Sequence, residues 1–285
     1  MEKADLTNME KADLTNKVAI VTGSGRGLGR AMALGLAGAG ANVVITAARE
    51  RAEIEAVAAE AQTLHPQARV LAVLADVTQP QSCARLVATT LQEFGRLDIL
   101  VNNAGRGMKY VSEHFLTQPT RFWEVDPETW RLVIETNVNG PFFMARAAVP
   151  AMLKAGWGRI INISMNHETM RRAGFSPYGP SKAALESETI IWSQDLQGSG
   201  ITINALLPGG ATATGMIPDS LPQTARQGLL DPAIIVPPLL YLASSASDRV
   251  SGQRVVAARW REDLEPAQAL QLASENSGWG LPNMG

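Results

Sequence analysis

A tyrosine, a lysine four positions later and an upstream serine have the types and spacing needed to move protons. They are Tyr178, Lys182 and Ser164. On a helix, residues i and i+4 share a face, so Lys182 would project beside Tyr178. A phenol titrates near ~10, and a neighbouring ammonium would lower the pKa of Tyr178. Ser164 could hydrogen-bond a carbonyl oxygen held between the two hydroxyls, which predicts ketone reduction or alcohol oxidation. Alone, the pair also fits a half-exposed helix with one aromatic residue on its core side.

A glycine-rich turn near the start of the chain predicts a dinucleotide site. Residues 17–22 form an apolar, β-branched run typical of a buried parallel strand, and a helix is expected up to about residue 39. Strand, glycine turn and helix together place bare backbone N–H groups and a helix N-terminus against a pyrophosphate. For the glycines alone, a plain turn is the alternative. The turn reads Gly23-Ser24-Gly25-Arg26-Gly27-Leu28-Gly29.

Strand and helix patterns alternate along the whole chain and predict a single α/β domain over residues 17–258. We expect one doubly wound, seven-stranded parallel sheet with helices on both faces. Ligands of such sheets bind beyond the carboxyl ends of the strands, where the polar residues of this chain also fall. The expected strands are 17–22, 42–47, 69–75, 98–103, 158–163, 201–207 and 253–257, and the expected helices include 50–63, 79–94, 127–154 and 178–197.

The order of these landmarks gives the chain a resemblance to the short-chain dehydrogenase/reductase family, and in particular to its 3-oxoacyl-thioester reductase-like members. The resemblance covers about residues 14–257 and implies a Rossmann fold. It depends on the glycine turn after Thr22, on Asn102-Asn103-Ala104-Gly105, and on Asn137 upstream of the serine, tyrosine and lysine. Further matches are Asp76-Val77 and Pro208-Gly209.

The resemblance also implies roles for individual residues. Tyr178 would be the general acid or base, Lys182 would lower its pKa and hold the nicotinamide ribose, and Ser164 would polarise the carbonyl. Asn137 would hold a relay water through its backbone. The implied cofactor-binding residues are Gly23, Ser24, Arg26, Gly27, Leu28, Gly29, Arg49, Asp76, Val77, Asn103, Ala104, Tyr178, Lys182, Pro208, Gly209, Thr212 and Thr214.

Charge near the second strand favours NADP(H) over NAD(H). An acidic residue at the end of this strand would bind the adenosine ribose and repel a 2′-phosphate. The chain instead reads Thr46-Ala47-Ala48-Arg49, and Arg26 in the glycine turn supplies a second guanidinium. Two such groups could bind a phosphate through charge-assisted hydrogen bonds. The alternative is that Arg49 starts a solvated helix and Arg26 faces water.

Two loops depart from the family pattern near the expected pocket. Ser164 precedes Tyr178 by fourteen positions, one more than is usual in the family, and His167 or Arg171 between them could meet an acidic or polar substrate. A solvated loop rim is the alternative. Residues 106–125 form a long, aromatic connection that could line the pocket or pack over the surface.

Composition restricts the class of protein. The formal net charge of −2 over 285 residues gives no electrostatic footprint for nucleic acid. No apolar run approaches the ~20 residues needed to span a bilayer. The single cysteine, Cys83, suits a reducing cytoplasm, and its helical apolar neighbours place it in the core. No metal site is expected.

The two ends of the chain lie outside the expected domain. Residues 1–8 repeat as residues 9–16, and we expect this duplicated segment, 1–16, to be disordered. The tail, 259–285, carries Trp260, Trp279 and Leu281 and is expected to pack on an active site or a neighbouring subunit. The resemblance implies a homodimer or homotetramer.

Three functions remain open at this point. The first is an NADP(H)-dependent ketoreductase or secondary-alcohol dehydrogenase acting on a small molecule. The second is NAD-dependent oxidation of a sugar or cyclic alcohol by the same fold. The third is a nucleotide-sensing protein without catalysis, which the complete set of four catalytic residues disfavours.

Overall fold

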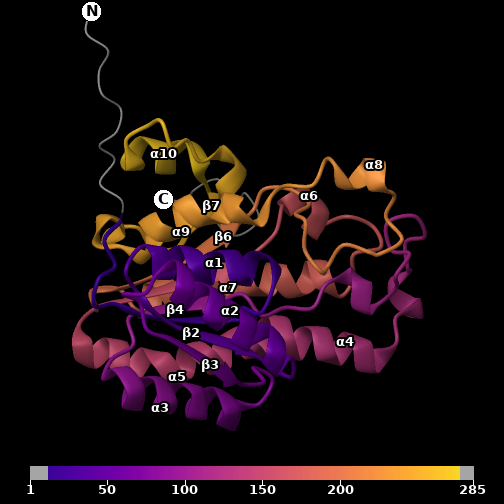
Figure 1. Ribbon diagram of the computed structural model, residues 1–285. Helices are drawn as coiled ribbons and strands as arrows, with labels where there is room; N and C mark the ends of the chain where they lie inside the picture. Colours follow the sequence, from indigo (N-terminus) through magenta and orange to yellow (C-terminus); the bar gives the residue numbers. More distant parts are fainter. Residues whose placement is uncertain (1–11, 277–285) are drawn as a thin grey trace, which may run out of the picture.

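One eight-stranded sheet organises the part of the chain that the computed structural model describes, residues 12–276 (Figure 1). The strand order is β3-β2-β1-β4-β5-β6-β7-β8, and every neighbouring pair is parallel except β7 and β8. The order reverses direction between β1 and β4, which creates a crevice at their carboxyl ends. The strands are β1 (Val18–Thr22), β2 (Asn42–Ala47), β3 (Val70–Leu74), β4 (Ile99–Asn102), β5 (Gly158–Ile163), β6 (Ile201–Leu207), β7 (Gln253–Val256) and β8 (Ser274–Asn276).

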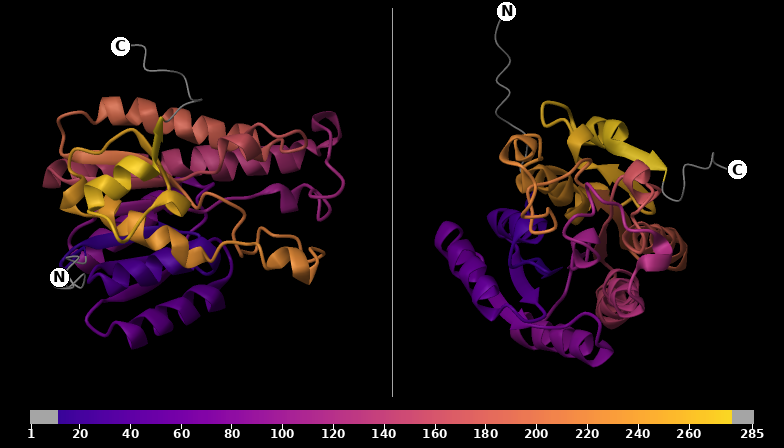
Figure 2. Two further views of the ribbon diagram at one scale, coloured as in Figure 1. Left: turned by 90° about the horizontal axis from the view of Figure 1, so that it is seen from above. Right: turned by 90° about the vertical axis from the view of Figure 1, so that its right-hand side faces the viewer.

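Helices cover both faces of the sheet, and α7 runs beside the helix formed by α4 and α5 (Figure 2). None of the helices among the described residues is long and apolar enough to cross a membrane. The helices are α1 (Gly27–Gly38), α2 (Arg51–Leu64), α3 (Pro80–Phe94), α4 (Pro127–Ile134), α5 (Gly140–Ala155), α6 (His167–Met170), α7 (Tyr178–Asp195), α8 (Gln223–Arg226), α9 (Val236–Ala243) and α10 (Pro266–Ala273).

Alternating side chains of the central strands fill two separate cores. Ala19 and Val21 of β1 pack with α1, α2 and α9, whereas Ile20 packs with α3 and α5. Because both faces are covered, the central strands are largely apolar, although β5 carries the buried polar residues Arg159 and Asn162. Cys83 lies fully buried in the second core, where burial raises the pKa of its thiol to about 11. The predicted core position of this cysteine and the predicted doubly wound fold are confirmed.

The long helix predicted over 127–154 is interrupted at Asn137. Asp126 caps α4 by accepting the Thr129 N–H, and a π-helical turn over Glu135–Asn139 joins α4 to α5. Pro141 has no N–H to continue the regular hydrogen-bond pattern, which explains the interruption. Asn137 therefore lies in this π-helical turn. Single π-helical turns inside α-helices are often found at functional sites.

The two ends of the described chain differ from expectation. Leu14, in the segment expected to be disordered, is buried in the first core, and its N–H donates to Ala39 O at 2.8 Å. The tail folds back on the same chain: Trp260 stacks on Tyr241 of α9 at 5.4 Å, and β8 extends the sheet to eight strands instead of seven. Trp279 and Leu281 lie outside the described residues.

Candidate active site

The glycine turn after β1 is fixed against the end of β4. Thr22 Oγ1 accepts the N–H groups of Asn103 and Ala104, each at 3.0 Å, and Asn103 Nδ2 donates to Gly23 O at 2.9 Å. Gly23 has a positive φ of 63°, and a Cβ there would lie 2.8 Å from Ala104 Cα. At Gly29 a Cβ would lie 2.3 Å from Gly23 O. These positions therefore require glycine.

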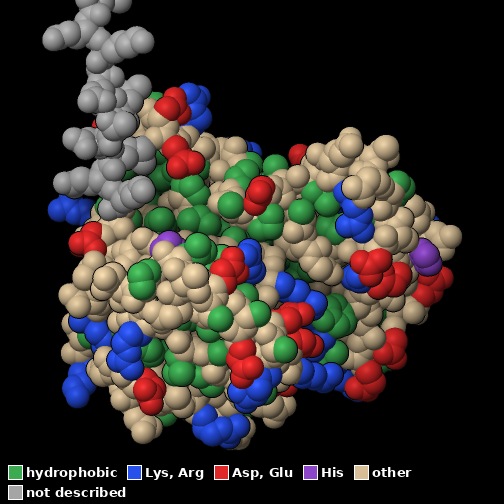
Figure 3. Space-filling model, in the orientation of Figure 1, with side chains coloured by type: hydrophobic (Ala, Val, Ile, Leu, Met, Phe, Trp, Pro, Cys, Tyr) green, Lys and Arg blue, Asp and Glu red, His purple; other side chains and the backbone are tan. Residues whose placement is uncertain are grey.

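A cavity of about 340 Å³ lies over this turn. Helix α1 begins at its edge, and no side chain caps the helix N-terminus or places an acid in its first turn. Unpaired N–H groups and the positive end of the helix dipole suit a pyrophosphate. A dinucleotide therefore fits the chemistry of the cavity. Figure 3 shows the hollowed face, with basic and acidic side chains gathered along it.

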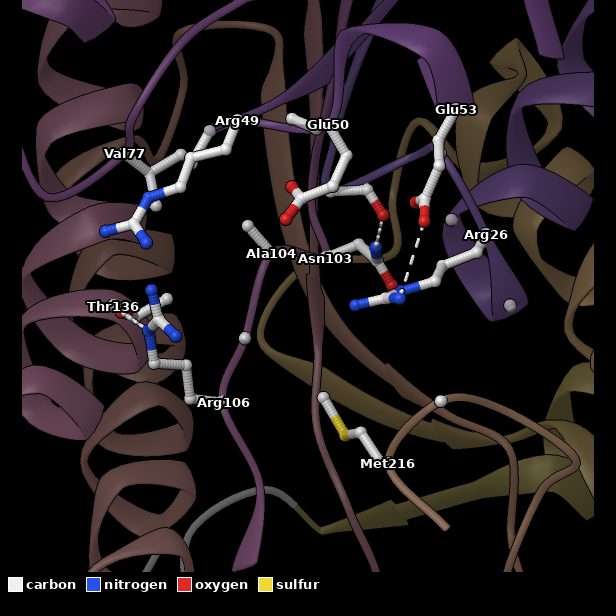
Figure 4. Close-up of a pocket in the computed structure, with 18 of the residues that line it drawn as sticks. Arg26, Arg49, Glu50, Glu53, Val77, Asn103, Ala104, Arg106, Thr136 and Met216 are labelled. Atoms are coloured by element: carbon white, nitrogen blue, oxygen red, sulfur yellow. Dashed lines mark hydrogen bonds and ion pairs between the residues drawn. The ribbon is translucent and has the colours of Figure 1, made fainter. Parts of the chain in front are cut away.

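Three guanidiniums and three carboxylates line the cavity. Arg26 forms an ion pair with Glu53 at 3.5 Å, whereas Arg49 and Arg106 point toward one another on the other side (Figure 4). Arg106 donates from Nε to Thr136 Oγ1 at 3.1 Å and lies 4.6 Å from the centre of the Tyr110 ring. The remaining carboxylates are Glu50 and Asp76.

The structure brings most of the predicted cofactor residues to this cavity. Ser24 does not line it, because its hydroxyl is buried and donates to Val21 O at 2.7 Å. Tyr178, Lys182, Pro208, Gly209 and Thr212 are also absent from its lining. Those that line it are Gly23, Arg26, Gly27, Leu28, Gly29, Arg49, Asp76, Val77, Asn103, Ala104 and Thr214.

Sequence reasoning missed several side chains of this lining, Glu50 and Glu53 among them. Arg106, Thr136 and Met216 all reach the cavity. Arg106 immediately follows the Asn-Asn-Ala-Gly segment, and Thr136 precedes Asn137. Both could have been predicted to line the site because each is next to a recognised motif. Met216 had a signal of the same kind, because it lies two positions after Thr214 in the segment after β6. Its thioether approaches Gly107.

Helix α7 carries Tyr178 and Lys182 in its first turns. Lys182 is buried, and its Nζ donates to Ile163 O at 2.7 Å, at the end of β5. Burial lowers the pKa of this ammonium to about 8, against an opposing effect of Glu186. Tyr178 packs against an apolar cluster, and burial raises its pKa to about 12. This direction is opposite to the expected one, because desolvation of the phenol dominates in the described structure.

Asn137 joins three segments of the site. Its Nδ2 donates to Ser181 Oγ on α7 at 2.9 Å and to Arg106 O at 2.9 Å, and its Oδ1 accepts the Arg106 N–H at 2.8 Å. Ser181 in turn donates to Tyr178 O at 2.7 Å. Both N–H protons of the amide are thus used, and its oxygen accepts one hydrogen bond. The π-helical turn, the loop after β4 and the start of α7 are held together through it.

Ser164 directly follows β5 and is almost completely buried. Its hydroxyl donates to Glu186 Oε1 at 2.5 Å. His167, which was expected either to meet substrate or to lie on a solvated rim, instead contacts Glu186 Oε2 through Nε2 at 3.0 Å. Arg171 is exposed, and within residues 12–276 its side chain donates only to His167 O. Glu186 was not recognised from the sequence, since a lone carboxylate on a helix carries no signal of burial.

An apolar cluster of side chains packs against Tyr178. Phe115, from the long loop after β4, meets Phe175 edge to face at 5.8 Å. In the same loop Phe122 and Trp123 are two-thirds exposed. Part of this loop therefore packs beside Tyr178, and part of it lies on the surface, so each of the two expectations for residues 106–125 holds for some of its residues. The remaining members of the cluster are Met108, Val111, Met165, Met170 and Ala183.

Comparisons with known proteins agree with this geometry. A family model described as short chain dehydrogenase matches residues 17–224. The 3-oxoacyl-[acyl-carrier-protein] reductase of Synechocystis sp. is 37% identical over 193 residues, which cover 68% of this chain and 73% of the relative.

Two solved structures share the fold at 28% identity. A metagenomic short-chain oxidoreductase in complex with NADP has a TM-score of 0.70 and covers 85% of this chain and 96% of its own. A structure from Beutenbergia cavernae, described as an NAD(P)-dependent gluconate 5-dehydrogenase with bound NADP, has a TM-score of 0.75 and covers 87% and 97%. The chain belongs to the short-chain dehydrogenase/reductase family of NAD(P)-dependent oxidoreductases.

Proposed function

We propose that this enzyme interconverts a ketone and a secondary alcohol with NADP(H), using Tyr178 as the general acid and base. One observation carries the proposal. Tyr178 and Lys182 on α7, Ser164 after β5 and Asn137 in the π-helical turn are linked by hydrogen bonds of Lys182 to Ile163 and of Asn137 to Ser181. They stand at the same edge of the sheet as the cavity over the glycine turn.

Protonation states favour Tyr178 as an acid in the reduction direction. With a pKa near 12, its phenol is protonated at neutral pH and can donate to a carbonyl oxygen. Lys182, with a pKa near 8, still carries most of its charge at neutral pH and stabilises the phenolate that proton donation leaves. When bound, the nicotinamide supplies the hydride, and the chain positions the carbonyl beside it.

Two arguments support NADP(H) over NAD(H). No carboxylate occupies the end of β2, and Arg49 follows it with its guanidinium in the cavity (Figure 4). Two structural neighbours are described with NADP. Arg26 is a weaker candidate, because Glu53 already forms an ion pair with it. The alternative, NAD-dependent oxidation of a sugar or cyclic alcohol, gains support from Glu50 and Glu53 in the same lining.

The surroundings of Tyr178 favour an apolar ketone as substrate. Methionine and phenylalanine side chains pack around the phenol, and the polar His167 is already bonded to Glu186. A sugar would leave its hydroxyls without partners against such a wall, which costs free energy for each unpaired group. Aliphatic or aromatic ketones therefore fit better than ketoses.

Apolar side chains on α5 and α7 support a homo-oligomer. Phe142, Leu153 and Ile191 each expose more than two-fifths of their surface, and Phe142 lies beside Trp192 of α7. A second copy of the chain would cover this face. Light scattering on the purified enzyme gives the number of subunits.

The loss of NADPH absorbance over a panel of ketones tests the reaction. The panel contains acyl thioesters, aromatic and cyclic ketones, keto acids and ketoses, with Tyr178→Phe as the matched control. We expect turnover of apolar ketones that Tyr178→Phe abolishes while it still binds NADPH. Turnover of ketoses alone with NADH supports the alternative. Silence of the wild-type enzyme in both directions, with cofactor still bound, contradicts the proposal.

A further inference from the structure

Arg106 brings a further guanidinium into the cavity, from a segment that is neither the glycine turn nor the end of β2. It directly follows Gly105 in the loop after β4, and its side chain lines the cavity on the same side as Arg49. Figure 4 shows the two guanidiniums pointing toward one another. Like charges that face each other repel, and an anion between them removes the repulsion. The arrangement therefore suits a bound anion.

Hydrogen bonds hold Arg106 in this position at its backbone and at its side chain. Its N–H donates to Asn137 Oδ1 at 2.8 Å, and its carbonyl accepts from Asn137 Nδ2 at 2.9 Å. Its Nε donates to Thr136 Oγ1 at 3.1 Å, and its Cζ lies 4.6 Å from the centre of the Tyr110 ring. A side chain that is already fixed loses less conformational entropy when a ligand binds. Arg106 is therefore preorganised toward the cavity.

The terminal nitrogens of Arg106 have no hydrogen-bond partner within residues 12–276. A guanidinium has five N–H donors, and Thr136 takes only the one on Nε. The donors on Nη1 and Nη2 form the planar fork that binds two oxygens of a phosphate or carboxylate. Arg106 therefore keeps its anion-binding edge free while its other edge is held in place.

The carboxylates of the cavity leave Arg49 and Arg106 without an ion pair among the described residues. Glu53 is paired with Arg26 at 3.5 Å. Asp76 Oδ1 accepts the N–H and the hydroxyl of a threonine two positions later, at 2.9 and 2.8 Å. Glu50 lines the cavity but pairs with neither guanidinium within residues 12–276. Charge balance on this side of the cavity is therefore left to a ligand.

We propose that Arg106 is a specificity-determining residue that binds the 2′-phosphate of NADP(H) together with Arg49. This inference rests on the proposed choice of NADP(H). It assigns the second guanidinium to the loop after β4 instead of to Arg26, which the sequence favoured. A phosphate monoester carries a charge between about −1.5 and −2 at neutral pH, enough to balance both side chains. NADH has a hydroxyl at the same place and gains no charge-assisted contact.

Isothermal titration of Arg106→Gln with NADPH and NADH tests the assignment. We expect NADPH to bind at least about tenfold more weakly, because charge-assisted hydrogen bonds are lost, and NADH binding to change by less than about twofold. Adenosine 2′,5′-bisphosphate and ADP repeat the comparison without the nicotinamide, and only the bisphosphate should lose affinity. Equal losses for both members of a pair overturn the proposal, since Arg106 would then act on the adenosine or on the fold. Unchanged NADPH binding overturns it as well.

Two further variants test the fork and its pairing with Arg49. Arg106→Lys keeps the charge but not the planar fork, so it should recover only part of the NADPH affinity. Arg49→Ala/Arg106→Gln should bind NADPH no more tightly than NADH. A double variant that still prefers NADPH by more than about tenfold overturns the proposal, because another group would then bind the phosphate. If Arg106→Gln does not fold, Arg106→Met, which keeps the apolar stem, is titrated in its place.

Arg121→Gln is the matched control. Arg121 lies in the same loop, is exposed and does not line the cavity. The substitution removes the same charge and should leave the binding of both cofactors unchanged. A loss equal to that of Arg106→Gln would show that long-range attraction is responsible, and it would overturn the proposal.

The wild-type titration separates this inference from the proposed function. If the wild-type enzyme binds NADPH no more tightly than NADH, the proposed choice of NADP(H) fails and the assignment of Arg106 fails with it. If the wild-type enzyme prefers NADPH and Arg106→Gln keeps that preference, only the assignment fails. Neither result depends on turnover, because binding is measured without a carbonyl substrate.

Discussion

Lys182 Nζ donates to the carbonyl of Ile163 at 2.7 Å, so helix α7 is attached to the end of β5, which Ser164 directly follows. The ammonium is buried and lies one helical turn before Glu186, whose charge raises its pKa while burial lowers it to about 8. The charge of Lys182 therefore changes within a pH range that assays can reach. The pKa of Lys182 also depends on the charge of Glu186, which is hydrogen-bonded to Ser164.

This relationship predicts the pH dependence of the reduction. Burial lowers the pKa of Lys182 from 10.5 to about 8, so its charge is present below pH ~8 and lost above it. Tyr178 stays protonated over the same range because its pKa is about 12. We expect kcat/KM for ketone reduction to fall as pH rises through ~8.

The pH–rate profile of Glu186→Gln provides the check. Removing the carboxylate removes the effect that raises the lysine pKa, so the inflection should move to lower pH. A profile that is flat to pH ~10, or an inflection that moves upward in the variant, contradicts this assignment.

Replacing Arg49 tests cofactor choice. Its guanidinium lies in the cavity lining beyond the end of β2. Arg49→Ala should weaken NADPH binding by at least about tenfold, or ~1.4 kcal/mol, because a charge-assisted contact to the 2′-phosphate is lost. NADH binding should barely change. Isothermal titration with both cofactors measures the difference.

Arg51→Ala is the control for this measurement. Arg51 begins α2, pairs with Glu55 and does not line the cavity. Equal losses for the two cofactors in Arg49→Ala, or an equal effect of Arg51→Ala, would show that general electrostatic attraction is responsible.

The glycine turn gives a steric prediction. A Cβ at Gly29 would lie 2.3 Å from Gly23 O and 2.6 Å from Asn103 Nδ2, so the turn or the end of β4 must shift. Gly29→Ala should destabilise the fold by about 1–3 kcal/mol, as overpacking does, and weaken cofactor binding. Thermal unfolding with and without NADPH measures both effects.

Gly228→Ala should have little effect on either quantity. Its added Cβ meets only Ala225 O, at 3.8 Å, and its φ is not in the left-handed region. If Gly29→Ala binds NADPH as tightly as wild type, cofactor binding does not require the close contact between Gly29 and the Gly23 carbonyl.

Features that depend on local sequence pattern could be predicted. The glycine turn that contains Gly23 and Gly29 was predicted because it directly follows a strand pattern, and the seven parallel strands were predicted from their apolar runs. The pKa of Tyr178 could not be predicted, because its direction depends on Phe115, Met170 and Phe175, which come from other segments. Glu186 was missed for the same reason. Its partner Arg254 lies 68 positions away, and only the folded sheet brings the two together.

Strand β8 was also beyond sequence reasoning. Ser274, Glu275 and Asn276 are three polar residues without alternation, so no strand pattern exists there. They pair antiparallel with β7, and Glu275 forms an ion pair there with the buried guanidinium of Arg254. The described part of the tail, up to Asn276, therefore packs on the sheet of the same chain.

Replacing Glu275 tests the role of this ion pair. Glu275→Gln removes the charge that balances Arg254 on the β8 side, which leaves the guanidinium with Glu186 as its single ionic partner. Arg254 should then shift toward Glu186 and strengthen that pair, which weakens the hold of Glu186 on the Ser164 hydroxyl. We expect a severalfold lower kcat with unchanged NADPH binding, and no further loss in Ser164→Ala. Glu265→Gln, exposed at the start of α10, is the control and should match wild type. A drop in melting temperature without any change in kcat would mean that β8 stabilises the sheet edge but does not act on the serine.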